Sequence, residues 1–373
     1  EIFNNSYLEG EYDSEYQSNI YRAIKNENIL KSLLAGKVSY LKGRMPIKTI
    51  EQTITIKMGE NQELEYSTVR KKELALSRMR RKGDDDENLA NLRSKSRQIC
   101  NIYLPDKDKY DEGDEEELEY LNDEDSDDEE NKKDDVKTQI VKKFIKQFYQ
   151  NIDDDILETN KKKLIIENIN KYSCKFAYLI DKLLNSTTEP YMSEGKYFPN
   201  GKVLIYSDFR EIVSGGVAFI AELLSIDDLG FMNFDDLIEP ILQDLKGQED
   251  DGGYEEAYKE QFNEANFEAE LTRIVIGRYR EIVEESGYKN KIFYLWKTSN
   301  ANSTKVNYLA KLLYNCVENL NGELLRIVFI TKSGSEGISF KAIRQVHIIE
   351  PFWQQTREVQ VIGRAVRFKS HDD

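Results

Sequence analysis

Four short, continuous apolar runs in the second half of the chain have the pattern of strands that are buried on both faces of a parallel sheet. They are VLIYS, KIFYL, RIVFIT and QVHIIE, at residues 203–207, 291–295, 326–331 and 345–350. Helical periodicity lies between them, near residues 216–224 and 305–318, and a final helix holds the sequence REVQVIGRAVR. Strands that alternate with helices predict a parallel α/β sheet, and ligands bind at the carboxyl ends of the strands in such sheets.

The first half of the chain has a more helical and more charged pattern. Residues 14–36 predict a helix, residues 54–58 (ITIKM) alternate like a strand, and residues 62–98 are charged and mostly helical. Residues 96–105 form a short apolar island, and helical periodicity returns over residues 136–185. We therefore expect a helical, partly disordered N-terminal region before the sheet.

The net charge of -16 is concentrated in two acidic stretches. Residues 106–135 hold 18 acidic residues against 4 lysines, and residues 226–270 hold 15 against 2. Without these stretches the chain has 47 basic and 36 acidic residues, a net charge of +11. The first stretch lacks the apolar residues that folding requires and predicts a disordered linker. The chain is thus a basic body that carries two acidic insertions.

Several classes of protein are disfavoured by the cysteines, the histidines and the apolar runs. Three widely spaced cysteines argue for a reducing compartment and, with only two histidines, against a zinc site. His347, on a strand, is expected to be a core-edge residue. No apolar run approaches the ~18 residues of a membrane span, and no signal-peptide pattern opens the chain. Because residue 1 is not Met, we expect the chain to be part of a longer protein.

About forty residues near the carboxyl terminus combine features that a phosphate-handling lobe requires. A Gly/Ser-rich turn at residues 333–337 follows a strand, and its backbone N–H groups can approach a phosphate closely. Arg364 and Arg367 are three residues apart and share a helical face, from which they can direct positive charge at a phosphoryl group. Gln360 can join that face, and Gly363 leaves room for another surface. Each feature alone is common, and the ordered set is what points to function.

These residues carry a specific resemblance. TKSGSEGIS (331–339) resembles motif V of superfamily-two helicases, and QVIGRAVR (360–367) resembles motif VI. VLIYSDF (203–209) resembles motif IV. The phrase EGISFKAIRQVHIIEPFWQQ is most similar to the helicase-like NTPases of large cytoplasmic DNA viruses. That branch includes poxvirus nucleoside triphosphatase I and the small subunit of the poxvirus early transcription factor, and the resemblance is strong over residues 326–371.

The resemblance implies the C-terminal motor lobe, with a RecA-like fold, of an ATP-dependent helicase or translocase. The roles that it implies are arginine fingers at Arg364 and Arg367, a link between lobes at Gln360, proximity to the nucleotide at Gly337, Ser339 and Gly363, and nucleic-acid backbone contacts at Ser207, Arg210, Thr331, Lys332 and Ser333. The chain contains no GxxxxGK[ST] phosphate loop. We therefore expect a missing first lobe to hold most of the ATP and Mg²⁺, and this chain alone to be inactive.

Partners, location and domain boundaries follow from the same resemblance. It implies a DNA or RNA backbone as the partner, viral RNA polymerase or transcription factors beside it, no membrane, and a location in the virion and host cytoplasm. The expected domains are a joining region over residues 1–105, a linker over 106–135, and the lobe over 136–373 with an acidic helical insertion at 226–290.

Two other functions stay open at this point. The lobe could be a non-catalytic scaffold in a viral transcription or packaging complex, or the chain could be an acidic interaction protein with a vestigial helicase likeness. The presence of Gln360, Arg364 and Arg367 argues against the second, because a lobe without ATP has no need of them.

Overall fold

The computed structural model describes residues 8–13, 18–24, 49–79, 93–105, 129–153, 155–250, 264–297, 301–331, 339–350, 355–366 and 370. The chain divides into two units, Glu1–Pro46 and Ile47–Asp373, and each is described by itself. The predicted linker at residues 106–135 lies largely outside the described residues, because only 129–135 belong to a described helix. The domain boundaries stay predictions.

The first unit contains a hairpin in place of the predicted helix. Strands β1 (Leu8–Asp13) and β2 (Ser18–Ile24) pair in antiparallel register. The helix predicted over residues 14–36 is therefore wrong where it overlaps β2. Ile20 and Ile24 are four residues apart, a spacing that fits one face of a helix and one face of a strand equally well. Pairing with β1 decides between the two.

The second unit is built on a five-stranded sheet in the order β6-β7-β8-β5-β9, and every neighbouring pair is parallel. Its strands are β5 (Lys202–Tyr206), β6 (Met232–Asn233), β7 (Ile292–Leu295), β8 (Ile327–Ile330) and β9 (Ile343–Ile348). This arrangement confirms the predicted RecA-like α/β fold. Four of the five strands were predicted to within about two residues, and β6 was not.

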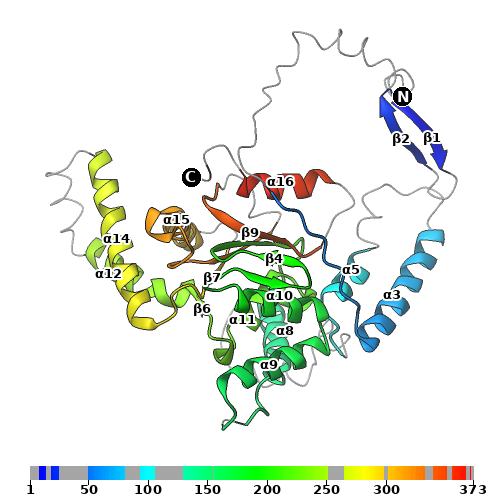
Figure 1. Ribbon diagram of the computed structural model, residues 1–373, viewed down its shortest axis with the longest axis horizontal. Helices are drawn as coiled ribbons and strands as arrows, with labels where there is room; N and C mark the ends of the chain where they lie inside the picture. Colours follow the sequence, from blue (N-terminus) through cyan, green and yellow to red (C-terminus); the bar gives the residue numbers. More distant parts are fainter. Residues whose placement is uncertain are drawn as a thin grey trace. The chain divides into compact units, whose positions relative to one another are not determined.

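Helices cover both faces of the sheet (Figure 1). One hydrophobic core includes residues of α8 (Glu129–Lys146), α9 (Glu158–Asn170), α10 (Cys174–Asn185) and α11 (Val217–Leu224). The other includes residues of α12 (Phe234–Asp250), α14 (Glu264–Ser286), α15 (Ala301–Asn315) and α16 (Gln355–Ala365). Within the described residues, no helix is long and apolar enough to cross a membrane.

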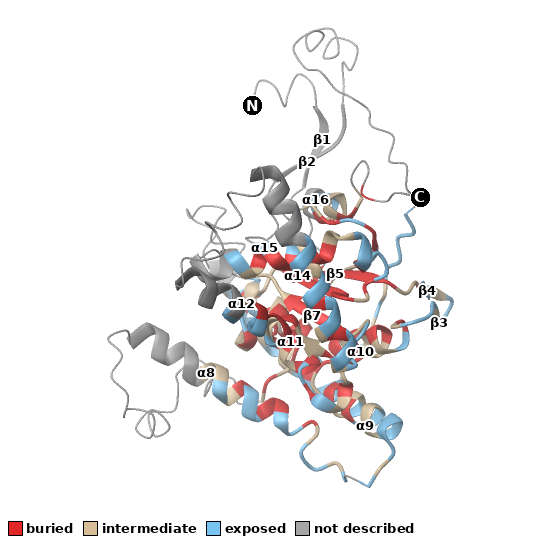
Figure 2. Ribbon diagram, turned by 90° about the vertical axis from the view of Figure 1, so that its left-hand side faces the viewer, coloured by how far each residue is buried: buried red, intermediate tan, exposed pale blue. Residues whose placement is uncertain are grey.

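The central strand β5 shows why these runs are continuously apolar. Val203 and Ile205 belong to the first core, whereas Leu204 and Tyr206 belong to the second. All four side chains are buried, and Figure 2 shows β5 and β7 as buried strands. Because successive side chains point to opposite faces, a strand that is covered on both sides buries consecutive apolar side chains.

The described part of the second acidic insertion, residues 226–250 and 264–290, packs onto the sheet. Phe231 and Phe234 are buried, and β6 between them pairs with β7 at the sheet edge. Helices α12 and α14 then lie against each other, with Phe234 and Tyr279 in ring contact at 5.4 Å. The apolar side chains in this part of the chain are therefore buried, although many of the residues around them are acidic.

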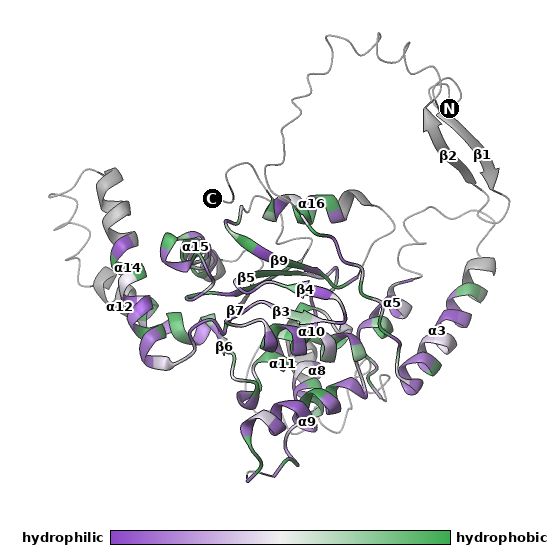
Figure 3. Ribbon diagram, viewed as in Figure 1, coloured by the Kyte–Doolittle hydropathy of each residue, from purple (hydrophilic) through white to green (hydrophobic). Residues whose placement is uncertain are grey.

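Two helices from the first half of the chain also belong to this unit, α3 (Glu60–Met79) and α5 (Ser94–Asn101). Hydrophilic residues dominate the described part of α3 (Figure 3). The strand predicted at residues 54–58 is wrong, because these residues join no sheet. Their alternation is real, since Ile54, Ile56 and Met58 are half-buried while residues 55 and 57 are exposed. The pattern reports which side chains face the protein, and not which backbone groups pair.

Arg326, at the start of β8, is a fully buried cation surrounded by carbonyl oxygens. Its guanidinium donates to the carbonyls of Leu183 and Ser186, both at 2.8 Å, and to the Ser186 hydroxyl at 3.1 Å. Burial lowers the pKa of Arg326 to about 10, so the side chain stays charged at neutral pH. These acceptors lie at the carboxyl end of α10, where helix carbonyls lack partners within the helix. Arg326 thus ties α10 to the sheet.

His347 of β9 is half-buried, as expected for a core-edge residue, and its Nε2 lies 2.9 Å from Oε1 of Gln345. Burial and the nearby positive charge of Arg326 lower the pKa of His347 to about 4.

Because the folded-state pKa of His347 lies below the unfolded value of 6.5, the folded state should lose stability as the pH falls from 6.5 to 4. We expect His347→Gln to lose less stability than the wild type over this range, measured by urea unfolding at pH 7 and pH 4.5. If the wild type and His347→Gln lose the same unfolding free energy, protonation of His347 does not cause the loss.

Candidate functional site

The strands β8, β5 and β9 are neighbours and run parallel, so their carboxyl ends lie side by side along one edge of the sheet, the strand-end edge. Ser207 and Asp208 follow β5, Thr331 follows β8, and Glu350 follows β9 two residues after its last position. Ser207, Thr331 and Glu350 are all buried. This is the edge at which parallel sheets bind ligands, so these residues define the candidate site.

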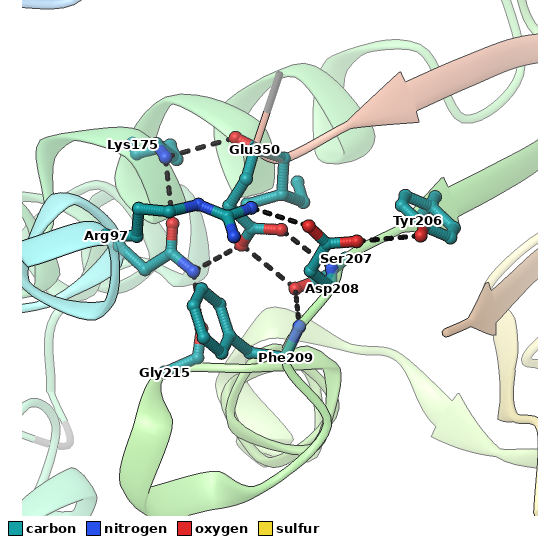
Figure 4. Close-up of polar contacts among 10 residues, drawn as sticks. Arg97, Lys175, Tyr206, Ser207, Asp208, Phe209, Gly215 and Glu350 are labelled. Atoms are coloured by element: carbon teal, nitrogen blue, oxygen red, sulfur yellow. Dashed lines mark hydrogen bonds and ion pairs between the residues drawn. The ribbon is translucent and has the colours of Figure 1, made fainter. Parts of the chain in front are cut away.

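Glu350 is the anchor of this edge (Figure 4). Its carboxylate accepts from the Ser207 hydroxyl at 2.9 Å, from the backbone N–H of Asp208 at 2.9 Å, and from the side-chain amide of Asn101. Burial raises the pKa of Glu350, and these hydrogen bonds together with the charge of Lys175 oppose that rise. A buried carboxylate with three donors holds its neighbours in a fixed geometry, because each lost donor would leave charge unsatisfied.

Asp208 is held from a different direction. Its carboxylate pairs with the Arg97 guanidinium at 2.5 Å and accepts from the Tyr206 hydroxyl at 2.8 Å. The Arg97 guanidinium carbon lies 5.3 Å from the centre of the Phe209 ring, within cation–π range. The side chain of Arg97 is 29% exposed and that of Asp208 is 10% exposed, so this ion pair is partly buried.

The loop after β5 folds back tightly onto the start of α11. The backbone N–H groups of Val217 and Ala218 donate to the carbonyls of Phe209 and Arg210, each at 3.0 Å. A Cβ atom at Gly216 would lie only 2.4 Å from the Phe209 carbonyl oxygen, so only glycine fits there. The far end of this loop is therefore fixed by α11, and its near end is fixed by Glu350.

Helix α16 carries the described part of the predicted finger motif. Val361 and Ala365 are buried, whereas Gln360 is exposed and Gly363 and Arg364 are half-buried. A Cβ at Gly363 would meet no atom within 4 Å, so the helix surface there is open. Arg367 lies outside the described residues.

Of the remaining predicted site residues, some lie within the described ranges and others lie outside them. Thr331 is buried at the end of β8, and the carbonyl of half-buried Ser339 accepts from the Asn315 side chain at 2.9 Å. The Ser207 hydroxyl is committed to Glu350, and Arg210 is half-buried in the loop. Lys332, Ser333 and Gly337 lie outside the described residues. The structure thus brings Ser207 and Arg210 together in one loop, and the ligand contacts of all these residues stay predictions.

The comparison with protein families bears directly on this edge. Residues 285–369 match the helicase conserved C-terminal domain, a span that covers β7, β8, β9 and α16. This part of the chain is therefore similar to the C-terminal domain of helicases. This match, together with relatives from large DNA viruses, confirms the predicted resemblance to helicase-like proteins of such viruses. The matched span includes Thr331 and Glu350 of the site, whereas Ser207 and Asp208 precede it.

Relatives of the helicase domain come from several large DNA viruses. A termination factor NPH-I homolog of African swine fever virus is 42% identical over 69 residues, 18% of this chain and 10% of the relative. A putative ATP-dependent RNA helicase, R563, of Acanthamoeba polyphaga mimivirus is 23% identical over 354 residues, 94% of this chain and 42% of the relative. Nucleoside triphosphatase I of Heliothis armigera entomopoxvirus is 35% identical over 81 residues, 19% of this chain and 12% of the relative. The matches span less than half the length of each relative.

Several residues that build the strand-end edge were not predicted from the sequence. They are Arg97, Asn101, Lys175 and Glu350. The one available signal was a carboxylate at the end of a predicted strand run, at Glu350. Within the described ranges, no group of three or more His, Cys, Asp and Glu side chains could hold a metal ion.

Proposed function

We propose that this chain supplies the second motor lobe of an ATP-dependent helicase or translocase that tracks along nucleic acid. The observation that carries the proposal is the helicase-domain match over residues 285–369, within which α16 bears Gln360 and Arg364 one helical turn apart. The relatives include proteins named as helicases and as a nucleoside triphosphatase, which favours ATP as the substrate. Mg²⁺ would accompany ATP on the other lobe.

In this proposal the chain contributes positive charge to a nucleotide held elsewhere. Arg364 and Arg367 act as arginine fingers that stabilise the charge developing on the transferred phosphoryl group. Gln360 links the lobes, and Ser339 and Gly337 lie near the nucleotide. The charge and position of Arg364 suit this role. Arg364 is a half-buried cation in the last turn of α16, and the helix surface at Gly363 has room for a second surface.

Nucleic acid would be gripped by its backbone along the strand-end edge. Ser207 and Arg210 of the loop after β5, with Thr331, Lys332 and Ser333 after β8, are the proposed contacts. Because such contacts replace counterions on phosphates, binding should weaken steeply with salt and depend little on base sequence. We further propose a role in viral transcription, in the virion and host cytoplasm, with viral RNA polymerase or transcription factors as partners. The termination-factor name of one relative supports the role in transcription, and the viral source of the relatives supports a viral location.

The experiment that tests this function is an ATPase assay of the complete protein with single-stranded DNA, duplex DNA and RNA. We expect at least one of the three to stimulate turnover, and the stimulation to fall as salt rises. A complete protein that hydrolyses no ATP with any of them would instead favour a non-catalytic scaffold.

Gly363 gives a second test, because its two effects should have opposite signs. Gly363→Ala adds a methyl group in open space and improves helix propensity, so the lobe should gain up to about 1 kcal/mol of stability. If another lobe closes against this surface, the same methyl group should lower ATP turnover of the complete protein on the order of tenfold. Thermal unfolding and steady-state phosphate release measure the two effects. A stabilised variant with full turnover would count against closure at Gly363.

A further inference from the structure

The last residue of α5 is the centre of the buried network at the sheet edge. Asn101 is fully buried, and its side-chain amide donates to the Gly215 carbonyl at 3.1 Å and to Glu350. Its side-chain oxygen accepts from Lys175 of α10 at 2.8 Å. One side chain therefore joins α10, the end of β9 and the turn before α11, although it lies 249 residues from Glu350 in sequence.

The backbone around Asn101 is fixed as firmly as its side chain. The Asn101 carbonyl accepts from the Ser173 hydroxyl at 2.5 Å, and the next residue, Ile102, belongs to the hydrophobic core. A Cβ atom at Gly215 would lie 2.5 Å from a side-chain methyl group of Ile102, so the Ile102 side chain packs closely against the backbone of Gly215. This segment is thus packed into the lobe and has little freedom to shift without moving the loop.

Helix α3 holds α5 from the other side. The Gln62 side-chain amide donates to the Ile99 carbonyl at 2.7 Å, and the Glu73 carboxylate accepts from the backbone N–H of Ser96 at 3.0 Å. Both Gln62 and Glu73 are buried. Since α3 and α5 brace each other, Asn101 is presented to Glu350 by a preformed support.

We propose that Asn101 is a positioning residue for nucleic-acid binding. Acting through Glu350, it fixes Ser207 and the Asp208 amide, and with them the near end of the loop that carries Arg210. Glu350 has three donors, and Asn101 is the only one of the three that lies outside this loop. Without Asn101, the only hydrogen bonds to the Glu350 carboxylate among those described come from Ser207 and Asp208, which belong to the loop that Glu350 has to fix. This inference rests on the proposed function, because it concerns the nucleic-acid contacts of the same lobe.

The test compares two buried asparagines in the complete protein. Asn319 is also fully buried, and its amide donates to the Tyr314 and Leu325 carbonyls at 3.2 and 2.9 Å. It precedes β8, at the opposite edge of the sheet from Glu350. Asn101→Ala and Asn319→Ala should therefore both lower stability, and only Asn101→Ala should weaken nucleic-acid binding.

The readout is the nucleic-acid concentration that gives half-maximal stimulation of ATP turnover. We expect this concentration to rise about tenfold for Asn101→Ala and to stay at the wild-type value for Asn319→Ala, with KM for ATP unchanged in both. If Asn101→Ala does not fold, Glu350→Gln carries the same test, because it keeps the size of the side chain and replaces one acceptor by a donor. A folded Glu350→Gln or Asn101→Ala variant with the Asn319→Ala value overturns the proposal. Failure of the proposed function is distinct, since the wild type itself would then show no stimulation.

Discussion

Arg364→Ala in the complete protein should lower kcat for ATP roughly 1,000-fold, as expected for loss of an arginine finger. The reason is electrostatic: the guanidinium meets charge that develops only in the transition state, so its loss should affect kcat far more than KM. Arg364 lies on α16 between the buried residues Val361 and Ala365, and the fold should survive because Arg364 itself is only half-buried. Steady-state phosphate release with saturating nucleic acid measures the effect.

Arg344→Ala is the matched control. Arg344 is an exposed arginine near the start of β9, far along the strand from Glu350. Its removal changes the net charge by the same amount and should leave kcat within about twofold of the wild type, as for most exposed positions. Equal losses from the two substitutions would mean that general charge, and not a finger, accounts for the effect.

Arg326→Met should destabilise the folded chain by about 3–5 kcal/mol. The substitution keeps most of the apolar stem but removes the donors to Leu183 and Ser186 of α10. Those acceptors are buried, and water cannot replace the lost donors without opening the core. Urea unfolding followed by circular dichroism at neutral pH gives the change in the unfolding midpoint.

Arg280→Met controls for the loss of an arginine as such. Arg280 pairs with Glu284 one turn away on α14 at 3.0 Å, and both side chains are more than half exposed. Solvent-exposed pairs contribute little, so the midpoint should not move. A small shift for Arg326→Met as well would show that the carbonyls at the end of α10 find other partners.

The strands could be predicted from the sequence because burial on both faces leaves a strong local signal. The runs VLIYS and RIVFIT have apolar residues or tyrosine at every position between their ends, and β5 and β8 begin and end within one residue of them. Strand β6 left no such signal, because two residues are too few for any pattern. At residues 54–58 the alternation marked the buried side chains correctly, but burial alone does not supply a pairing partner.

The candidate site was less predictable, because its contacts are long-range. The motif residues Gln360 and Arg364 could be predicted to share a helix, since their roles follow from local spacing. Nothing local relates Asn101 to Glu350, or Arg97 to Asp208, which lie 249 and 111 residues apart. The apolar island at residues 96–105 predicted burial, and the polar network that accompanies it depends on the tertiary fold.

The most direct test of the central claim is the affinity of the complete protein for ADP with aluminium fluoride, an analogue of the phosphoryl-transfer transition state, relative to ADP alone. The account predicts that Arg364→Ala weakens binding of the analogue on the order of 100-fold and leaves the affinity for ADP unchanged. If both ligands bind the variant as tightly as they bind the wild type, Arg364 does not reach the nucleotide and the motor-lobe account is wrong.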